Sequence, residues 1–135
     1  MRIILLMMIG LSSLWSLEIF VDTKTGLVWQ DDVDAKTVKK EWSGAKSYCK
    51  KLTLDAKSDW RVPNIKELQS IVDISRYKPA IKKGFQNIAS SFYWSSSAIV
   101  SGSSSAWIVY FYSGHTNGYD KSDKYYVRCV RGSRQ

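Results

Sequence analysis

The segment Ser58-Asp59-Trp60-Arg61-Val62-Pro63-Asn64-Ile65-Lys66-Glu67-Leu68 joins an extended run to the beginning of a helix. Trp60 and Val62 are two positions apart, so in an extended chain both side chains point to the same face. Asn64 is a favourable N-cap, and Glu67 follows at the position that completes a capping box. The segment therefore predicts a buried Trp60 at the entry to a short amphipathic helix.

A further helix is predicted on the N-terminal side of this segment. Within residues 41–52 the apolar side chains recur at helical spacing and form one stripe: Trp42, Ala45, Cys49 and Leu52. Two strands joined by a turn are predicted for 17–31, an irregular segment for 76–91, strands for 92–95, 106–112 and 125–131, and loops for 95–105 and 113–121. Helices followed by strands, without a linker or repeat, predict one α+β domain.

Four segments, in order along the chain, resemble motifs of one protein family. Trp60-Arg61-Val62-Pro63-Asn64-x-x-Glu67-Leu68 resembles the signature WRLPT-x-x-EL. The others are Asp22–Asp31 (D-x-x-TGL-x-W), Tyr93–Ser97 (YWSS) and Val127–Gly132 (VRCVR). The chain is similar to the DUF1566 family, the C-terminal domain of the Legionella collagen-like adhesin. The resemblance implies a C-type-lectin-like α+β fold, with two helices and a mostly antiparallel sheet, and an adhesin-like function.

The first sixteen residues have the pattern of a secretory signal peptide. Arg2 precedes the apolar run 3–11, and small residues follow up to Ser16. The run is too short for a stable membrane-spanning helix, and an uncleaved anchor is the alternative. We expect residues 1–16 to be removed, which leaves 17–135 as an exported domain without a membrane span, periplasmic or secreted to the cell surface.

The two cysteines, Cys49 and Cys129, are expected to form a disulfide. An exported chain with an even number of cysteines favours pairing. Cys49 lies on the apolar stripe of the predicted helix at 41–52, so its sulfur should face the core. A metal site is the weaker alternative, because two cysteines and one distant histidine lack the ligand number and spacing. The fold implied by the resemblance likewise links its first helix to its last strand.

No catalytic constellation is recognisable, so we expect no enzyme, cofactor or metal. His115 lies in a turn-forming segment, and the serines of 95–105 have no partner base. Asp31, Asp32 and Asp34 are spaced like part of a calcium loop, but the glycine and distal glutamate of an EF-hand are missing. A flexible acidic turn is expected there.

Calcium-dependent sugar binding is not implied by the resemblance. Sugar-binding C-type lectins use a Glu-Pro-Asn or Gln-Pro-Asp tripeptide and a Trp-Asn-Asp strand. Here Val62-Pro63-Asn64 lacks the acid, and Trp-Asn-Asp is absent.

The formal net charge of +8 is the positive indication of function. A basic exported domain favours anionic partners such as sulfated glycans, anionic lipid head groups or acidic surface polymers; nucleic acid is not expected. Lys39, Lys46 and Lys50 have the spacing of one helix face and are the candidate polyanion-binding residues. The alternative is a solvated face that keeps the domain soluble.

Aromatic side chains offer a second candidate surface. Four tryptophans are expected in the core: Trp29, Trp42, Trp60 and Trp94. The second candidate ligand surface is formed by residues of the late strands and loops: Tyr110, Tyr112, Lys121, Lys124 and Arg128. A packed sheet face is the alternative to an exposed aromatic platform.

Three functions follow from these observations. The first is an exported, non-enzymatic binding module that engages anionic glycan or a surface protein. The second is a structural or assembly module of the bacterial envelope with a protein partner and no small ligand. The third, an enzyme with paired reactive cysteines, is suggested by the resemblance, because some C-type-lectin-like relatives catalyse oxidative chemistry with paired cysteines. It is disfavoured because both cysteines are expected in a structural bridge.

Overall fold

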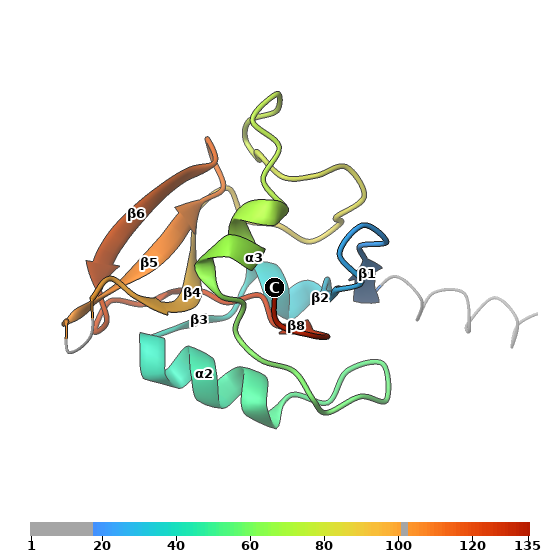
Figure 1. The fold of residues 1–135 in the computed structure, drawn as a ribbon, viewed down its shortest axis with the longest axis horizontal. Helices are drawn as coiled ribbons and strands as arrows, with labels where there is room; N and C mark the ends of the chain where they lie inside the picture. Colours follow the sequence, from blue (N-terminus) through green and yellow to red (C-terminus); the bar gives the residue numbers. More distant parts are fainter. Residues whose placement is uncertain (1–17, 101–102) are drawn as a thin grey trace, which may run out of the picture.

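The computed structural model describes residues 18–100 and 103–135, which form one α+β domain. The expected signal peptide, residues 1–16, lies outside the described part. Figure 1 shows two helices packed beside two small sheets, with the chain's C-terminal end near the middle of the molecule. The α+β class is confirmed; the C-type-lectin-like fold stays a prediction.

The smaller sheet brings the two ends of the domain together. Its strands are β1 (Ile19–Val21), β2 (Val28–Gln30) and β8 (Val130–Arg131), in the order β1-β2-β8 and all antiparallel. Gly26 closes the turn between β1 and β2 with a φ of 76°, which glycine adopts without steric cost. Its amide donates to the Asp22 carbonyl at 2.8 Å. The predicted strand–turn–strand unit is confirmed.

The larger sheet has five strands in the order β3-β7-β4-β5-β6. They are β3 (Lys39–Lys40), β4 (Phe92–Ala98), β5 (Ser105–Tyr110), β6 (His115–Asp120) and β7 (Tyr125–Tyr126). Neighbours pair antiparallel except β4 and β7, which are parallel. The mostly antiparallel character is confirmed.

Two strand predictions were wrong. The turn-forming segment 113–121 contains β6, which pairs with β5 from Ser105↔Asp120 to Tyr110↔His115. This strand needs a glycine at position 118 because the Ile99 side chain packs against the backbone there. A Cβ on residue 118 would lie 1.9 Å from the Ile99 Cδ1. The expected strand 125–131 is divided between β7 and β8, because the chain crosses there from one sheet to the other.

Both predicted helices are confirmed. They are α2 (Trp42–Lys51) and α3 (Ile65–Ser70). Asn64 caps α3: its side-chain oxygen accepts from the Glu67 amide at 2.8 Å, and the Glu67 carboxylate accepts from the Asn64 amide at 2.9 Å. No described helix has the length and apolar character needed to cross a bilayer.

The core lies between α2, α3 and the sheets, and the disulfide crosses it. Cys49 of α2 and Cys129 are bonded, with their Cα atoms 5.6 Å apart, as predicted. Trp29, Trp60 and Trp94 are buried as expected. Trp42 is half-buried at the surface of α2, because its ring lies under lysine side chains rather than inside the core.

Removing the bridge should lower stability without changing the folded surface. The Cys49→Ala/Cys129→Ala variant should lose about 2–4 kcal/mol of unfolding free energy, since a long loop in the unfolded chain is no longer closed. Urea denaturation followed by circular dichroism measures this loss. A variant as stable as wild type would contradict the prediction.

Candidate functional site

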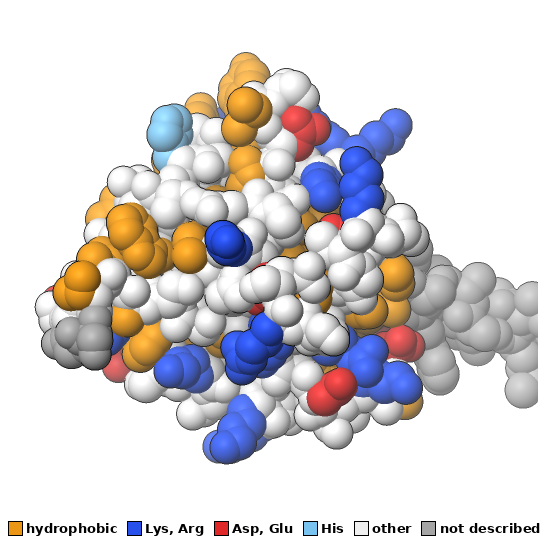
Figure 2. Space-filling view, in the orientation of Figure 1, with side chains coloured by type: hydrophobic (Ala, Val, Ile, Leu, Met, Phe, Trp, Pro, Cys, Tyr) orange, Lys and Arg blue, Asp and Glu red, His pale blue; other side chains and the backbone are white. Residues whose placement is uncertain are grey.

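A basic cleft lies between α2 and the extended segment that precedes α3. Its volume is about 250 Å³. We call it the basic cleft and define it by its lining residues: Lys46, Lys50, Trp60, Arg61, Val62, Ser96 and Arg134. Figure 2 shows Lys and Arg side chains gathered over the lower middle of the molecule, where α2 lies in Figure 1.

α2 supplies two cations to one wall. Lys46 and Lys50 are four residues apart, so they lie on the same helix face about 6 Å apart along the axis. Trp42, one turn earlier, supports this wall: the Lys46 Nζ lies 4.0 Å from its ring centroid. The Lys121 Nζ lies 4.5 Å from the same ring. The Trp42 indole is held in place because its N–H donates to the Ser95 carbonyl at 2.8 Å.

The extended segment before α3 forms the apolar floor of the cleft. Trp60 and Val62 are each 4% exposed, and the Trp60 indole N–H donates to the Lys57 carbonyl at 3.1 Å. Arg61 exchanges two backbone hydrogen bonds with Val130, and the Ser96 amide donates to the Pro63 carbonyl at 2.8 Å. The floor is therefore attached on both sides to the sheets and is preorganised.

Arg61 contributes little free charge, because Glu67 neutralises it. The guanidinium donates to both Glu67 carboxylate oxygens, at 2.7 and 2.8 Å. Burial alone would raise the pKa of Glu67, but the hydrogen bonds from Arg61, Asn64 and Gln135 outweigh it and lower that pKa. The remaining cations of the cleft, Lys46, Lys50 and Arg134, make no salt bridge within residues 18–100 and 103–135.

Lys39 does not belong to this group, which corrects the expected helix face. Glu41 is the N-cap in extended conformation, so α2 begins only at Trp42. Lys39 lies on β3 opposite Tyr126, and its Nζ is 5.0 Å from the Tyr126 ring centroid. Of the three expected lysines, the structure brings Lys46 and Lys50 together and leaves Lys39 outside the cleft.

The second candidate surface is dispersed. Tyr110 stacks on Tyr112 at 5.7 Å and contacts Phe92 at 4.6 Å, so these rings lie on the larger sheet. Lys121 lies beside Trp42, with its Nζ 2.6 Å from the Ser103 carbonyl oxygen. Lys124 is exposed after β6.

Arg128 is not a surface residue, and its assignment to the second candidate surface was wrong. Its side chain is 0% exposed, and the guanidinium contacts Asp31 at 3.1 Å. It also donates to the backbone carbonyls of Gln30 and Asn87. The Phe85 ring centroid lies 4.8 Å from the guanidinium carbon. Arg128 is a buried connector between β2, the irregular segment and the C-terminal part of the chain.

The expected flexible acidic turn is an ordered structure, so that prediction was also wrong. Asp31 accepts the amides of Gln86 and Asn87 at 2.9 Å each. Asp32 is the N-cap of the 3-10 helix η2 (Val33–Lys36), where it accepts the Ala35 amide. The donors to Asp31 lie far along the chain, so the local spacing of the acidic residues does not reveal them.

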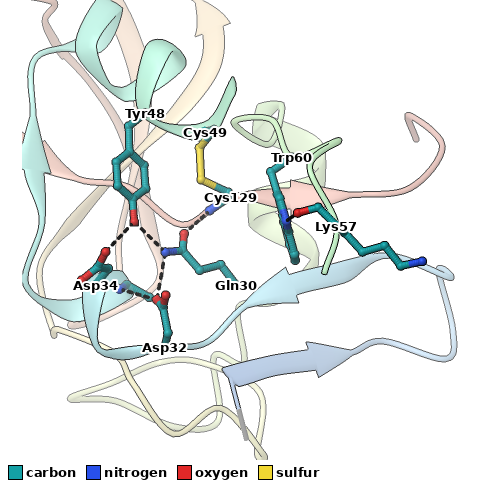
Figure 3. Close-up of a disulfide and its surroundings, with 9 residues drawn as sticks. Gln30, Asp32, Asp34, Tyr48, Cys49, Lys57, Trp60 and Cys129 are labelled. Carbon is teal, nitrogen blue, oxygen red and sulfur yellow. Dashed lines mark hydrogen bonds between the residues drawn. A yellow bond between two sulfur atoms is a disulfide. The ribbon is translucent and has the colours of Figure 1, made fainter. Parts of the chain in front are cut away.

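The acidic segment continues into a polar network beside the disulfide (Figure 3). The Gln30 side-chain amide donates to Asp32 at 2.9 Å and to the Tyr48 hydroxyl at 3.0 Å. The Tyr48 hydroxyl in turn donates to Asp34 at 3.0 Å. Burial, reinforced by this bond and the nearby carboxylates, raises the pKa of the Tyr48 hydroxyl. Burial and the neighbouring Asp34 charge also raise the pKa of Asp32.

The network is structural, and no metal centre accompanies it in the described residues. The Gln30 side-chain oxygen accepts the Cys129 amide at 2.9 Å, so the network positions the chain at the disulfide. Within residues 18–100 and 103–135, no group of three or more His, Cys, Asp or Glu side chains is arranged to hold a metal ion.

Sequence reasoning found two of the three free cations of the cleft. Arg134 was missed because nothing in its local sequence distinguishes it. The sequence indicated a folding role for Trp60, Arg61 and Val62. That they also line the cleft becomes clear only from the position of α2 in the folded chain.

Comparison with known proteins identifies one family. The sequence profile of the Lcl C-terminal domain matches residues 18–131, nearly all of the described chain. No curated protein matches the sequence.

Proposed function

Because the chain belongs to the Lcl C-terminal domain family, we propose that it is an exported, adhesin-like binding module whose basic cleft holds anionic groups of a glycan or surface protein. The observation that carries the proposal is the arrangement of three cations, Lys46, Lys50 and Arg134, around a preorganised apolar floor. None of the three has a carboxylate partner in the part of the chain that the structure describes. Family membership supports a binding or adhesin-like role.

The chemistry of the cleft favours sulfate or carboxylate groups on a polymer. Lys46 and Lys50 act as hydrated point charges about 6 Å apart along the helix axis, so each contacts a separate anionic group. Arg134 lies at the same cleft and adds a planar donor that matches a sulfate or carboxylate. Such contacts are individually weak and screened by salt, so binding should be multivalent and salt-dependent.

A binding role, rather than catalysis, is supported by the state of the reactive side chains. Both cysteines are joined in the disulfide, which leaves no thiol for oxidative chemistry. His115 lies on an edge strand, with its Nδ1 2.6 Å from the Ser113 hydroxyl oxygen and no carboxylate among its hydrogen-bond partners in the described residues. The disulfide also fits an oxidising compartment and thus export.

The cleft can be tested by removing its free cations. The variant Lys46→Gln/Lys50→Gln/Arg134→Gln removes the charges, keeps part of each hydrocarbon stem and should fold normally. We expect its affinity for heparin to fall about tenfold at physiological salt, since three ionic contacts are lost. Salt elution from a heparin column and calorimetric titration measure the change.

A control of equal charge separates the cleft from general basicity. The variant Lys24→Gln/Lys36→Gln/Lys124→Gln removes three exposed cations that do not line the cleft. Equal loss in both variants would contradict a defined site. Salt-insensitive binding of one envelope protein, unchanged in the cleft variant, would instead favour an assembly module.

A further inference from the structure

The segment 73–80, which we call the tip loop, projects from the domain at the end opposite α2. Figure 1 shows it as the green loop at the top of the view, and Figure 2 shows hydrophobic and basic side chains at the same end. Ile74 is 87% exposed and Tyr77 is 74% exposed. Both side chains are large and apolar. Among the described residues, the other exposed large apolar side chains have smaller exposed fractions.

The tip loop is held in this shape by backbone hydrogen bonds. The Asp73 amide donates to the Ala80 carbonyl at 3.2 Å, which closes the loop at its base. The amides of Lys78 and Ala80 donate to carbonyls of the segment after β5, at 2.8 and 2.7 Å. Because these bonds anchor the base of the loop and the strand segment beside it, the loop presents Ile74 and Tyr77 to solvent.

The β5–β6 turn widens this apolar end. Tyr112 is 39% exposed, and its ring centroid lies 6.3 Å from that of Tyr77. Ile74 borders a hollow of about 270 Å³ with Ser113, Gly114 and His115. The apolar side chains thus lie on a projecting loop, with a hollow beside Ile74, rather than on a flat patch (Figure 1).

Basic residues predominate in the tip loop and just after it. Residues 73–83 contain four basic side chains and one acid: Arg76, Lys78, Lys82, Lys83 and Asp73. Lys82 is paired with Asp22 at 3.5 Å, whereas Arg76, Lys78 and Lys83 are exposed and in no salt bridge of the described residues. The Asp73 carboxylate accepts the Ser75 hydroxyl at 2.6 Å and its amide at 3.0 Å. The tip loop therefore carries exposed apolar side chains and exposed basic side chains, with Lys83 just beyond it.

We propose that the tip loop docks on an anionic lipid bilayer, with Ile74 and Tyr77 entering the interfacial region and Arg76, Lys78 and Lys83 contacting lipid phosphates. An amphipathic tyrosine ring and an aliphatic chain flanked by cations match the apolar and anionic layers of such a surface.

The shape of the tip favours a bilayer over a protein partner. A stable protein interface buries about 800 Å² on each side, which a convex tip of a few side chains does not provide. A bilayer accommodates a convex wedge because lipids rearrange around it. In this orientation α2, which carries Lys46 and Lys50 of the basic cleft, lies at the far end of the domain (Figure 1). A docked molecule therefore presents this wall of the cleft away from the lipid.

The decisive experiment reports on the tip alone. Both cysteines of the chain are bonded, so Ile74→Cys introduces a single thiol for an environment-sensitive NBD dye. We expect its emission to shift to the blue and rise with phosphatidylcholine–phosphatidylglycerol vesicles, and to change little with phosphatidylcholine alone. The matched control is Val33→Cys with the same dye, because Val33 is 59% exposed and lies on η2.

Charge and apolar variants in the labelled chain complete the test. Arg76→Gln/Lys78→Gln/Lys83→Gln should raise the lipid concentration for half-maximal signal about tenfold, and Tyr77→Ser several-fold. Lys24→Gln/Lys36→Gln/Lys124→Gln and Val21→Ser should change it less than about twofold. An unchanged signal at residue 74, an equal shift at residue 33, or equal effects of tip and control variants would each overturn the proposal. The proposal would also be overturned if vesicle binding were lost in the cleft variant Lys46→Gln/Lys50→Gln/Arg134→Gln but kept in the tip variants.

Discussion

Replacing Arg128 with methionine should lower the free energy of unfolding by about 3–5 kcal/mol, because it leaves the buried Asp31 charge without its partner. The two side chains are 0% and 2% exposed, and the guanidinium also satisfies the carbonyls of Gln30 and Asn87. Methionine keeps a side chain of similar length beside Phe85 but supplies neither the positive charge nor a donor. The loss of unfolding free energy in Arg128→Met therefore measures mainly the broken charge pair rather than lost packing.

Urea denaturation of the disulfide-intact protein measures this effect. Asp31→Asn should also destabilise, and the double variant should lose less than the sum of the single losses, since neither charge is then stranded. Arg131→Met is the matched control: Arg131 pairs with Asp59, whose side chain is 64% exposed, so little stability should be lost. Similar losses for Arg128→Met and Arg131→Met would contradict the proposed role of burial.

Truncating Trp60 to alanine should cost about 3–5 kcal/mol, since it removes a large buried side chain and leaves a cavity. Trp60 is 4% exposed and packs with the disulfide, Val62 and Trp94 in the larger of the two core clusters. Trp60 also lines the basic cleft, so folded Trp60→Ala molecules should bind anionic polymers more weakly.

A capping variant on the same segment is the control for Trp60→Ala. Asn64→Ala removes one hydrogen bond of the capping box and should cost about 1 kcal/mol. Thermal and urea unfolding distinguish the two variants. Equal losses, or ready iodide quenching of Trp60 in the folded protein, would show that Trp60 is not a core anchor.

Local features of the fold were predictable because their partners are close in the sequence. Asn64 and Glu67 form the capping box within one turn, and Trp60 is buried where the alternation placed it. The disulfide was predictable from the parity of the cysteines and the apolar stripe that carries Cys49. For the cap and for Trp60 a few neighbouring residues contain the whole signal, whereas the disulfide followed from the number of cysteines although they lie 80 positions apart.

Strand β6 and Arg128 were missed because their environment is set by distant residues. β6 consists of residues that also form turns, and it is a strand because β5 offers a partner along its full length. The alternation in Val127-Arg128-Cys129 predicts an outward Arg128. The chain crosses between the two sheets at this point, so both sides of it are covered and Arg128 faces Asp31.

The sequence by itself determined the α+β class, the two helices, the disulfide and the basic character of the domain, because helical spacing, capping and charge are local or additive properties. Only the tertiary structure decided which cations act together. Lys46 and Lys50 meet Arg61 and Arg134 because Arg61 pairs with Val130, close to the C-terminal end of the chain. Backbone pairing between such distant segments has no local signature, so the cleft and the projecting tip loop appear only in the folded chain.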